Sequence, residues 1–430
     1  MYYYNIKYIN KQNYMDLFIK YKKQLIITGF IFFILLTGYI IYALFLKPAT
    51  EENKNTGPGA LNNTAMGGLP LSSPGRKQTA TSTGTGILPA GEEEKSAGAN
   101  RDLIAKGGLT QVSEINSAKT LGAVLNSSGN GLKYYNKDDS KFYQIDENGQ
   151  IKTLSDKVFH SVDNVVWSPN KNKAILEYPD GANIIYDFDN TKQITLPSHW
   201  QDFNYSPSGD KLIMKSMGLD PDNRWLAVVN EDGSQVRALE PLGTEDATVY
   251  PSWSPNNQTV AMYTKGVDFY RQEVYFVGLN DENFKSMIIE GRGFQSKWSP
   301  QGDKLLYSVY ANSNNLKPLL WIANAQGDNI GTNRKNLNIE TWADKCVFSS
   351  NTEIYCAIPN NLQEGAGLFL ELAGQSSDQL YKIDTATGIK KLIAVPDGSY
   401  NMSDLNVTKD GSRLYFTDKT TEKLYNIKLK

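Results

Sequence analysis

The chain has 430 residues, a formal net charge of −2, and 21% charged and 11% aromatic residues. This composition excludes a collagen, a coiled coil and a wholly disordered protein, and without a basic excess it gives no reason to expect a nucleic-acid partner. Two Cys and two His exclude a disulfide-dense scaffold and a four-cysteine zinc site, and they leave little room for histidine catalysis. We therefore expect no metal and no cofactor.

The N-terminal part resembles a membrane signal anchor. Residues 25–46 form a run of 22 residues without a charge, and a helix of that length spans about 33 Å, enough for a hydrocarbon core of roughly 30 Å. Residues 1–24 carry five Lys against Asp16, which predicts a cytoplasmic tail followed by an extracytoplasmic chain, periplasmic or extracellular. A cleaved signal peptide and a buried core helix are the alternatives, but the run is longer than the 7–15 apolar residues usual in a signal peptide.

Residues 47–107 are interpreted as a flexible linker. Gly, Pro, Ser, Thr, Ala and Asn are abundant here, without helical or strand periodicity. Such a segment buries too little apolar surface to offset the entropy of ordering it. It would tether the following domain, residues 108–430, to the membrane.

A turn motif recurs through residues 108–430. Its clearest copies begin at Trp167-Ser168-Pro169, Tyr205-Ser206-Pro207, Trp253-Ser254-Pro255 and Trp298-Ser299-Pro300, and weaker copies lie near Asn126, Ser349 and Thr408. The period of about 40–50 residues indicates a solenoid or a propeller. Each copy is followed by a short apolar strand and then by a hairpin with its own turn signal, as at Asn148-Gly149 and Asp232-Gly233. Four short strands per repeat are typical of a propeller blade.

The fold class is therefore predicted to be all-β: a seven-bladed β-propeller, or a six-bladed one if the weak first copy is not a full blade. The last repeat ends after its third strand. Residues 108–115 precede the first copy and read as an unpaired strand. Pairing this strand with the last blade would close the ring and remove an exposed sheet edge.

The Trp-Ser-Pro-x-Gly-Asp-Lys-like turns resemble the TolB-like, WD-like propeller repeats of bacterial envelope proteins. This resemblance covers about residues 108–430 and implies a protein-binding module. The aromatic residue before Ser is interpreted as a packing residue between blades, and Pro with Asn, Asp or Gly as the turn itself. The chain differs from TolB in its apparent seven repeats, its predicted anchor and its lack of an α/β domain ahead of the propeller.

No catalytic motif is evident. There is no Gly-x-Ser-x-Gly elbow, no phosphate-binding loop and no His-Glu-x-x-His sequence. The acidic turn 220–223 lacks the spacing of a calcium loop and is interpreted as a polar turn. We predict no catalytic residue and no metal ligand.

Two further features are predicted. Cys346 and Cys356 flank a turn, and if Val347 faces Tyr355 the two Cys are opposed at a distance that suits a disulfide, with two buried free thiols as the alternative. Loops that enter the first strand of each blade should converge on one face. Their aromatic and basic residues are candidates for a binding rim, or else for packing between blades: His160, Trp200, Tyr250, Arg292, Phe294, Trp342 and Tyr400. The insertion at 359–378 is either a flap over that face or a variable loop.

These observations favour a membrane-anchored, non-enzymatic scaffold that binds a protein or peptide of the cell envelope. The alternatives are a cell-wall or carbohydrate-binding propeller, and a propeller lyase or hydrolase that uses carboxylates in the channel.

Overall fold

The computed structural model describes residues 30, 35–37 and 101–430. The chain separates into two units, residues 1–90 and 91–430. In the first unit, residues 30 and 35–37 are helical. The predicted cytoplasmic tail, most of the predicted anchor and linker residues 47–100 lie outside the described residues. Within the described ranges, no helix combines the length and apolar character that crossing a membrane requires.

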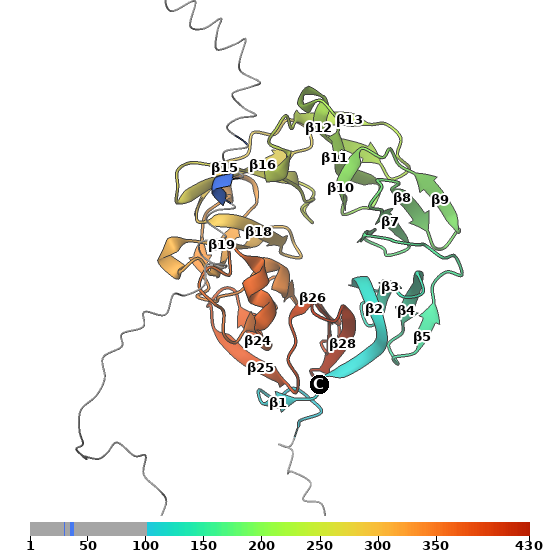
Figure 1. Cartoon of the computed structure of the whole chain (residues 1–430), viewed down its shortest axis with the longest axis vertical. Coiled ribbons are helices and arrows are strands. Elements are labelled where there is room, and N and C mark those ends of the chain that lie inside the picture. The colour runs from blue at the N-terminus through green and yellow to red at the C-terminus, as the bar shows by residue number, and fades with distance from the viewer. Residues whose placement is uncertain (1–29, 31–34, 38–100) are drawn as a thin grey trace, which may run out of the picture. The chain divides into compact units, whose positions relative to one another are not determined.

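The second unit is an all-β propeller, in which antiparallel sheets follow one another around a ring (Figure 1). Four sheets have four strands each. These are β6 (Asn164–Trp167), β7 (Lys173–Glu177), β8 (Ile184–Asp187) and β9 (Lys192–Thr195); β10 (Trp200–Tyr205), β11 (Lys211–Met217), β12 (Arg224–Asn230) and β13 (Arg237–Pro241); β14 (Val249–Pro251), β15 (Thr259–Gly266), β16 (Arg271–Gly278) and β17 (Met287–Glu290); and β18 (Arg292–Trp298), β19 (Lys304–Tyr310), β20 (Pro318–Asn324) and β21 (Lys335–Asn336).

A fifth sheet consists of β22 (Cys346–Phe348), β23 (Glu353–Pro359), β24 (Asp378–Asp384), β25 (Lys390–Pro396) and the short strand β1 (Leu109–Thr110), which pairs in parallel with β25. A sixth sheet has seven strands: β26 (Met402–Val407), β27 (Arg413–Asp418), β28 (Lys423–Lys428), β2 (Ser113–Leu125), β3 (Leu132–Asn136), β4 (Lys141–Ile145) and β5 (Ile151–Thr153). Single 3-10 turns occur at η2 (Pro221–Asn223), η3 (Asp246–Thr248), η4 (Asn312–Asn314), η5 (Gly327–Asn329), η6 (Ala343–Lys345) and η7 (Leu370–Gln375).

This sheet count differs from the prediction of seven separate blades, or six. Five separate blade sheets form, and the rest of the ring is one continuous seven-stranded sheet. The physical reason is the length of β2, whose 13 residues serve two partners. Its first residues pair with β28, as in Ser113 opposite Asn426, and its last residues pair with β3, as in Leu125 opposite Leu132.

The strand before the first repeat does close the ring. Figure 1 shows β2 beside β28, at the point where the two ends of the propeller meet. Leu109 and Thr110 pair instead with β25 of the neighbouring sheet. Residues 102–107, which composition assigns to the linker, also hydrogen-bond to these sheets: Ala105 N donates to Lys428 O at 2.8 Å and Gly107 N to Ile393 O at 2.8 Å.

The recurring turn has a shared hydrogen-bond pattern that explains its sequence. In each clear copy the Ser hydroxyl accepts a hydrogen bond from the backbone N–H five residues later, as between Ser299 and Lys304 at 3.1 Å. The same hydroxyl donates to an Asp or Asn in the turn, as from Ser299 to Asp303 at 2.8 Å. Equivalent acceptor contacts occur at Ser168, Ser206, Ser254 and Thr408. Ser and Asp therefore satisfy backbone donors that the turn would otherwise leave unpaired.

The Trp residues before these turns pack between sheets. Trp167 lies in a cluster with Phe142 and Phe188, and its Nε1 donates to the carbonyl of Gly122 in β2 at 2.7 Å. Trp298 Nε1 donates to Ser252 Oγ at 3.0 Å, on the link that follows β14. Each indole fills the space between two sheets and also satisfies its single donor there.

Candidate functional site

Two types of connection between strands lie on the same face of the ring. Because successive strands run antiparallel, the turn between the second and third strands of a sheet emerges on the same side as the link into its first strand. The predicted rim residues lie either on links of the second kind, as His160, Trp342 and Tyr400 do, or within the first strands that these links enter. The structure adds three turns of the first kind: 267–270 between β15 and β16, 311–317 between β19 and β20, and 360–377 between β23 and β24.

Most of the predicted rim residues are packed inside the propeller. Trp200, Phe294 and Trp342 are only 4–5% exposed and belong to hydrophobic clusters. The ring of Tyr250 packs edge-on against Phe294, with 5.9 Å between centroids. These four residues therefore have the packing role that the sequence analysis gave as the alternative to binding.

The other three differ among themselves. Tyr400 is half-buried and packs against Phe416 and Tyr425 at the ring closure. His160 is exposed in a turn before β6. Arg292 is half-buried at the start of β18 and lines a surface cavity.

The cavity beside Arg292 has a volume of about 420 Å³, and four connections between strands contribute to it. We call it the aromatic hollow. Its walls are Phe269, Tyr270, Gly291, Arg292, Tyr310, Ala311, Asn312, Leu316 and Leu368. Phe269 and Tyr270 are 74% and 63% exposed. Their rings pack edge-to-face on each other, with 5.2 Å between centroids. Large apolar side chains are thus displayed at a turn where polar residues are usual.

Arg292 is fixed against this turn by backbone contacts. Its guanidinium donates to the carbonyl of Asp268, and its Nε lies 3.5 Å from the carbonyl of Phe269. In the described part of the chain, Arg292 takes part in no ion pair, whereas its neighbour Arg271 is paired with Asp268. Among the described residues, the charge of Arg292 therefore faces backbone carbonyls and no carboxylate.

Close backbone packing shapes the floor of the hollow. Gly293 has φ +67°, and a Cβ there would lie 2.4 Å from Tyr310 Cε1. Only glycine tolerates both the left-handed backbone and the contact with the ring. The pairing of β18 with β19 changes register at this point, between Arg292 and Gln295.

The insertion between β23 and β24 packs onto the preceding sheet. Gly365 N donates to Asn315 O at 2.9 Å, and Gly367 N donates to Leu316 O at 2.8 Å. These contacts place Leu368 in the wall of the aromatic hollow. Leu368 and the next two residues, Phe369 and Leu370, are 47–57% exposed. Leu368 shares the wall of the hollow with Phe269 and Tyr270.

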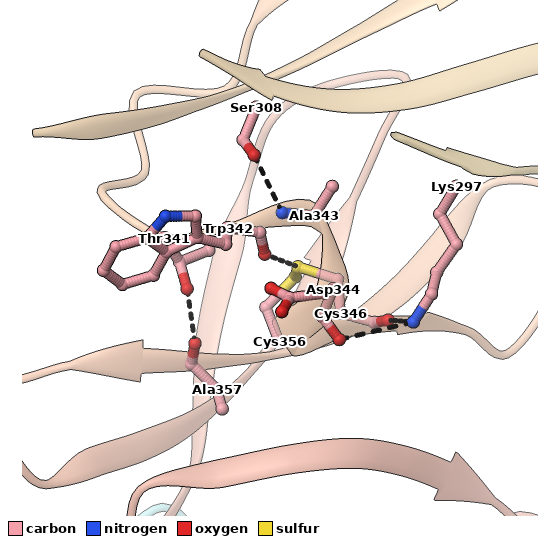
Figure 2. Close-up of a disulfide and its surroundings, with 9 residues drawn as sticks. All are labelled: Lys297, Ser308, Thr341, Trp342, Ala343, Asp344, Cys346, Cys356 and Ala357. Carbon is pink, nitrogen blue, oxygen red and sulfur yellow. Dashed lines mark hydrogen bonds between the residues drawn. A yellow bond between two sulfur atoms is a disulfide. The ribbon is translucent and has the colours of Figure 1, made fainter. Parts of the chain in front are cut away.

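The η6 turn, which carries Trp342 at its start, is held by a disulfide and several hydrogen bonds. Cys346 and Cys356 form a disulfide, with Cys346 directly opposite Cys356 and Val347 opposite Tyr355. Figure 2 shows the Trp342 ring on one side of this turn and Lys297 on the other, with Lys297 Nζ donating to the carbonyl of Cys346 at 2.6 Å. Ala343 N also donates to Ser308 Oγ at 3.1 Å, which ties η6 to β19.

Charged groups of both signs lie near η6. Burial lowers the pKa of Lys297, although Asp344 and Asp404 oppose the change. Burial raises the pKa of Asp404, against the effect of Lys297 and Lys419. Among the described residues, no group of three or more His, Cys, Asp or Glu side chains is placed to hold a metal ion.

Comparison with protein-family models and with curated proteins finds no match. Among solved structures, the chain is similar to an oligogalacturonate lyase in complex with manganese, with 14% identity and a TM-score of 0.48 over 74% of this chain and 93% of that one. An oligogalacturonate lyase from Vibrio parahaemolyticus gives 10% identity, a TM-score of 0.48 and the same coverages. A β-propeller domain from Myceliophteria thermophila gives 12% identity and a TM-score of 0.47 over 74% of this chain and all of that one. Similarities of this size carry no inference about function, and the propeller assignment rests on the strand pairing described above.

Sequence analysis missed Phe269 and Tyr270, which stand out most in the structure. The available signal was a Val267-Asp268-Phe269-Tyr270 turn with three apolar residues, where a hairpin normally has polar ones. The repeat pattern points to the links between blades, which include the position of Arg292 but not the neighbouring turn 267–270.

Proposed function

We propose that this chain is a membrane-anchored, extracytoplasmic β-propeller that acts as a non-enzymatic scaffold for a protein or peptide of the cell envelope. The observation that supports it best is the aromatic hollow, where exposed Phe269 and Tyr270 surround a cavity of about 420 Å³ beside Arg292. Aromatic and Arg side chains contribute most to protein–protein binding energy. The partner segment that fits presents an apolar side chain to the hollow and a carboxylate to Arg292.

The binding test is a pull-down from envelope extract with the purified propeller, followed by affinity measurement on the captured partner. Phe269→Ala and Arg292→Ala should each weaken binding at least about tenfold. Ile389→Ala removes an exposed apolar side chain away from the hollow, and Arg237→Ala removes another Arg that donates to a backbone carbonyl. The proposal would be contradicted if Ile389→Ala and Arg237→Ala weakened partner binding as much as Phe269→Ala and Arg292→Ala do. It would also be contradicted if Phe269→Ala captured the partner as well as the wild-type chain does.

Trp200 and Trp342 are unsuitable for this test. Both are buried in hydrophobic clusters, so their replacement by Ala would leave large cavities and lower the stability of the fold. A loss of binding in such variants would not distinguish a contact residue from a packing residue.

The membrane location is supported by the uncharged run at 25–46 and the Lys-rich segment before it. Protease added to intact cells or spheroplasts should digest the propeller and leave residues 1–24 protected. A propeller that is protected in intact spheroplasts and digested only after lysis would overturn this orientation.

The turn chemistry supports TolB-like repeats and a sevenfold count of blades. Within the seven-stranded sheet, β2 changes partner between Lys119 and Thr120. We count the part with β26, β27 and β28 as one blade and the part with β3, β4 and β5 as another. An experimental structure in which these two parts show no rotation relative to each other would reject the count.

An enzyme is the second candidate, and the raised pKa of Asp404 on the inner side of the ring is the observation that favours it. A raised pKa brings a carboxyl closer to the range in which it can serve as a general acid. Assays of lyase and hydrolase activity on envelope glycans, with Asp404→Asn as the variant, test this candidate. Turnover that Asp404→Asn abolishes would replace the scaffold proposal.

A further inference from the structure

A second, smaller cavity lies under the insertion and is distinct from the aromatic hollow. It has a volume of about 130 Å³, and we call it the polar pocket. Gln295 of β18, Lys345 of η6 and Asn401 before β26 line it, with Trp342 and Leu370 as apolar walls. The hollow is lined by Leu368, whereas the polar pocket is lined by Leu370, so the two cavities share the insertion but none of their lining residues.

Two side-chain oxygens in this pocket have no hydrogen-bond partner. Gln295 Oε1 and Asn401 Oδ1 are both buried and unpaired, and Asn401 is only 8% exposed as a whole. A buried acceptor without a donor costs about 1–3 kcal/mol. Asn183 shows the usual arrangement: its amide accepts from Tyr178 N at 3.1 Å and donates to Trp200 O at 2.8 Å. The two free acceptors are therefore matched to donors on a ligand.

The pocket also offers hydrogen-bond donors without a strong net charge. Lys345 Nζ lies 2.6 Å from Asp378 Oδ2, and Lys419 Nζ lies 3.4 Å from Asp344 Oδ2. Each ammonium has three N–H groups, so donors remain after these pairs have formed. Since the charges are compensated in pairs, the lining favours an uncharged ligand that both donates and accepts hydrogen bonds. Hydroxyl groups do both.

The size and the apolar walls narrow the ligand further. A cavity of about 150 Å³ holds benzene, and a hexose has about twice as many non-hydrogen atoms as benzene. The polar pocket, at about 130 Å³, therefore takes up one edge of a sugar-sized ring and leaves the rest of the ligand outside. The indole of Trp342 and the side chain of Leu370 offer apolar surface to the C–H groups of such a ring. A carbohydrate ring combines hydroxyl groups at its edge with C–H groups on its faces.

We propose that the polar pocket binds the edge of one ring of a neutral carbohydrate, whose hydroxyl groups donate to Gln295 Oε1 and Asn401 Oδ1 and accept from Lys345 and Lys419. The site is independent of partner binding at the aromatic hollow, since different side chains form it.

The test is a titration of the purified propeller with neutral monosaccharides, namely glucose, galactose and N-acetylglucosamine. Tryptophan fluorescence and the thermal unfolding midpoint are the readouts. At least one sugar should change the fluorescence and raise the midpoint, and Trp342→Phe should remove the fluorescence change. If no sugar binds, or if a free amino acid binds in place of every sugar, the proposal is overturned.

Two variants separate ligand contact from folding. Asn401→Leu and Gln295→Met replace the unpaired amides by apolar groups of similar shape. They should lower sugar affinity about tenfold or more while leaving the midpoint without sugar unchanged or higher, because an unpaired buried acceptor is removed. Tyr270→Ala in the aromatic hollow serves as the control and should bind sugar as the wild-type chain does. Sugar binding that survives both Asn401→Leu and Gln295→Met would overturn the proposal.

Discussion

Lys345 Nζ lies 2.6 Å from Asp378 Oδ2, and both side chains are almost completely buried. The same carboxylate oxygen accepts a hydrogen bond from Met402 N at 2.6 Å. One buried carboxylate thus joins η6, β24 and β26, the elements around the polar pocket. Burial lowers the pKa of Lys345 and raises that of Asp378, while each partner opposes the shift of the other.

Removing one member of this pair should be far more costly than removing both. Lys345→Met leaves a buried, unpaired carboxylate and should lower the free energy of unfolding by about 3–5 kcal/mol. The double variant Lys345→Met, Asp378→Leu should lose clearly less, because no uncompensated charge remains. Urea denaturation of the propeller provides the measurement. Lys423→Met, which breaks the partly exposed pair with Glu114, is the control and should cost under about 1 kcal/mol. Equal losses for Lys345→Met and Lys423→Met would contradict the prediction.

Trp167 should contribute to stability mainly by packing and to a smaller extent by its hydrogen bond to Gly122. Trp167→Ala should cost about 3–5 kcal/mol, because it opens a cavity between two sheets. Trp167→Phe keeps part of the packing but leaves the Gly122 carbonyl without its side-chain donor, so its cost should be smaller. Trp225→Ala, at a partly exposed position, is the matched control. If Trp225→Ala lowers the free energy of unfolding as much as Trp167→Ala does, the proposed packing of Trp167 between two sheets is wrong.

Asp410 should make stability depend on pH in the acid range. Hydrogen bonds from Thr408 and Ser412 lower its pKa to about 2, compared with about 3.9 in an unfolded chain. A carboxyl whose pKa is lower in the folded state stabilises above the unfolded value, and that contribution disappears as the pH falls from about 4 to about 2. The stability difference between the wild type and Asp410→Asn should therefore shrink over this range. The direct check is an NMR titration of Asp410, and a pKa near 4 in the folded protein would refute the prediction.

The Cys346–Cys356 disulfide should be inaccessible in the native protein and stabilising. Both residues are fully buried, and the bond closes a loop with a sequence separation of 10. Closing a short loop of this kind contributes about 2–3 kcal/mol. The double variant Cys346→Ala, Cys356→Ala should lose about that much in denaturant titrations. In denaturant without reductant, a thiol reagent should detect no free Cys. Two free thiols under those conditions would show that the bond does not form.

Parts of the fold follow from local sequence. The Ser-Pro turns can be recognised in the sequence because their Ser and Asp side chains hydrogen-bond within the same turn, as Ser299 and Asp303 do. The spacing of these turns along the chain predicts a propeller. The opposition of Cys346 and Cys356 follows from the two-residue period of antiparallel strands on either side of a turn. The turns and the opposed Cys pair depend on residues that are close together in the chain, so they can be predicted without knowing how the sheets pack.

The candidate site was predicted only in part. Arg292, the first residue of β18, lines the hollow. Trp200, Phe294 and Trp342 are buried, which agrees with packing between blades, the alternative that the sequence also allowed. Whether an aromatic side chain at such a position faces solvent or the adjacent sheet depends on the packing of two sheets. Sequence spacing does not contain that information.

The sequence by itself determined the repeat and the strand-rich architecture, since turn chemistry and strand period act locally. Of the predicted closing strand 108–115, only the part from Ser113 onward pairs with the last blade, whereas Leu109 and Thr110 pair with β25. Only the tertiary structure decided how the sheets divide, because one long strand, β2, serves β28 and β3 at once. It also decided that Phe269, Arg292 and Leu368, far apart in the chain, form one cavity. The physical reason is that a binding surface depends on which links of different sheets meet in space, and only the packing of those sheets sets that.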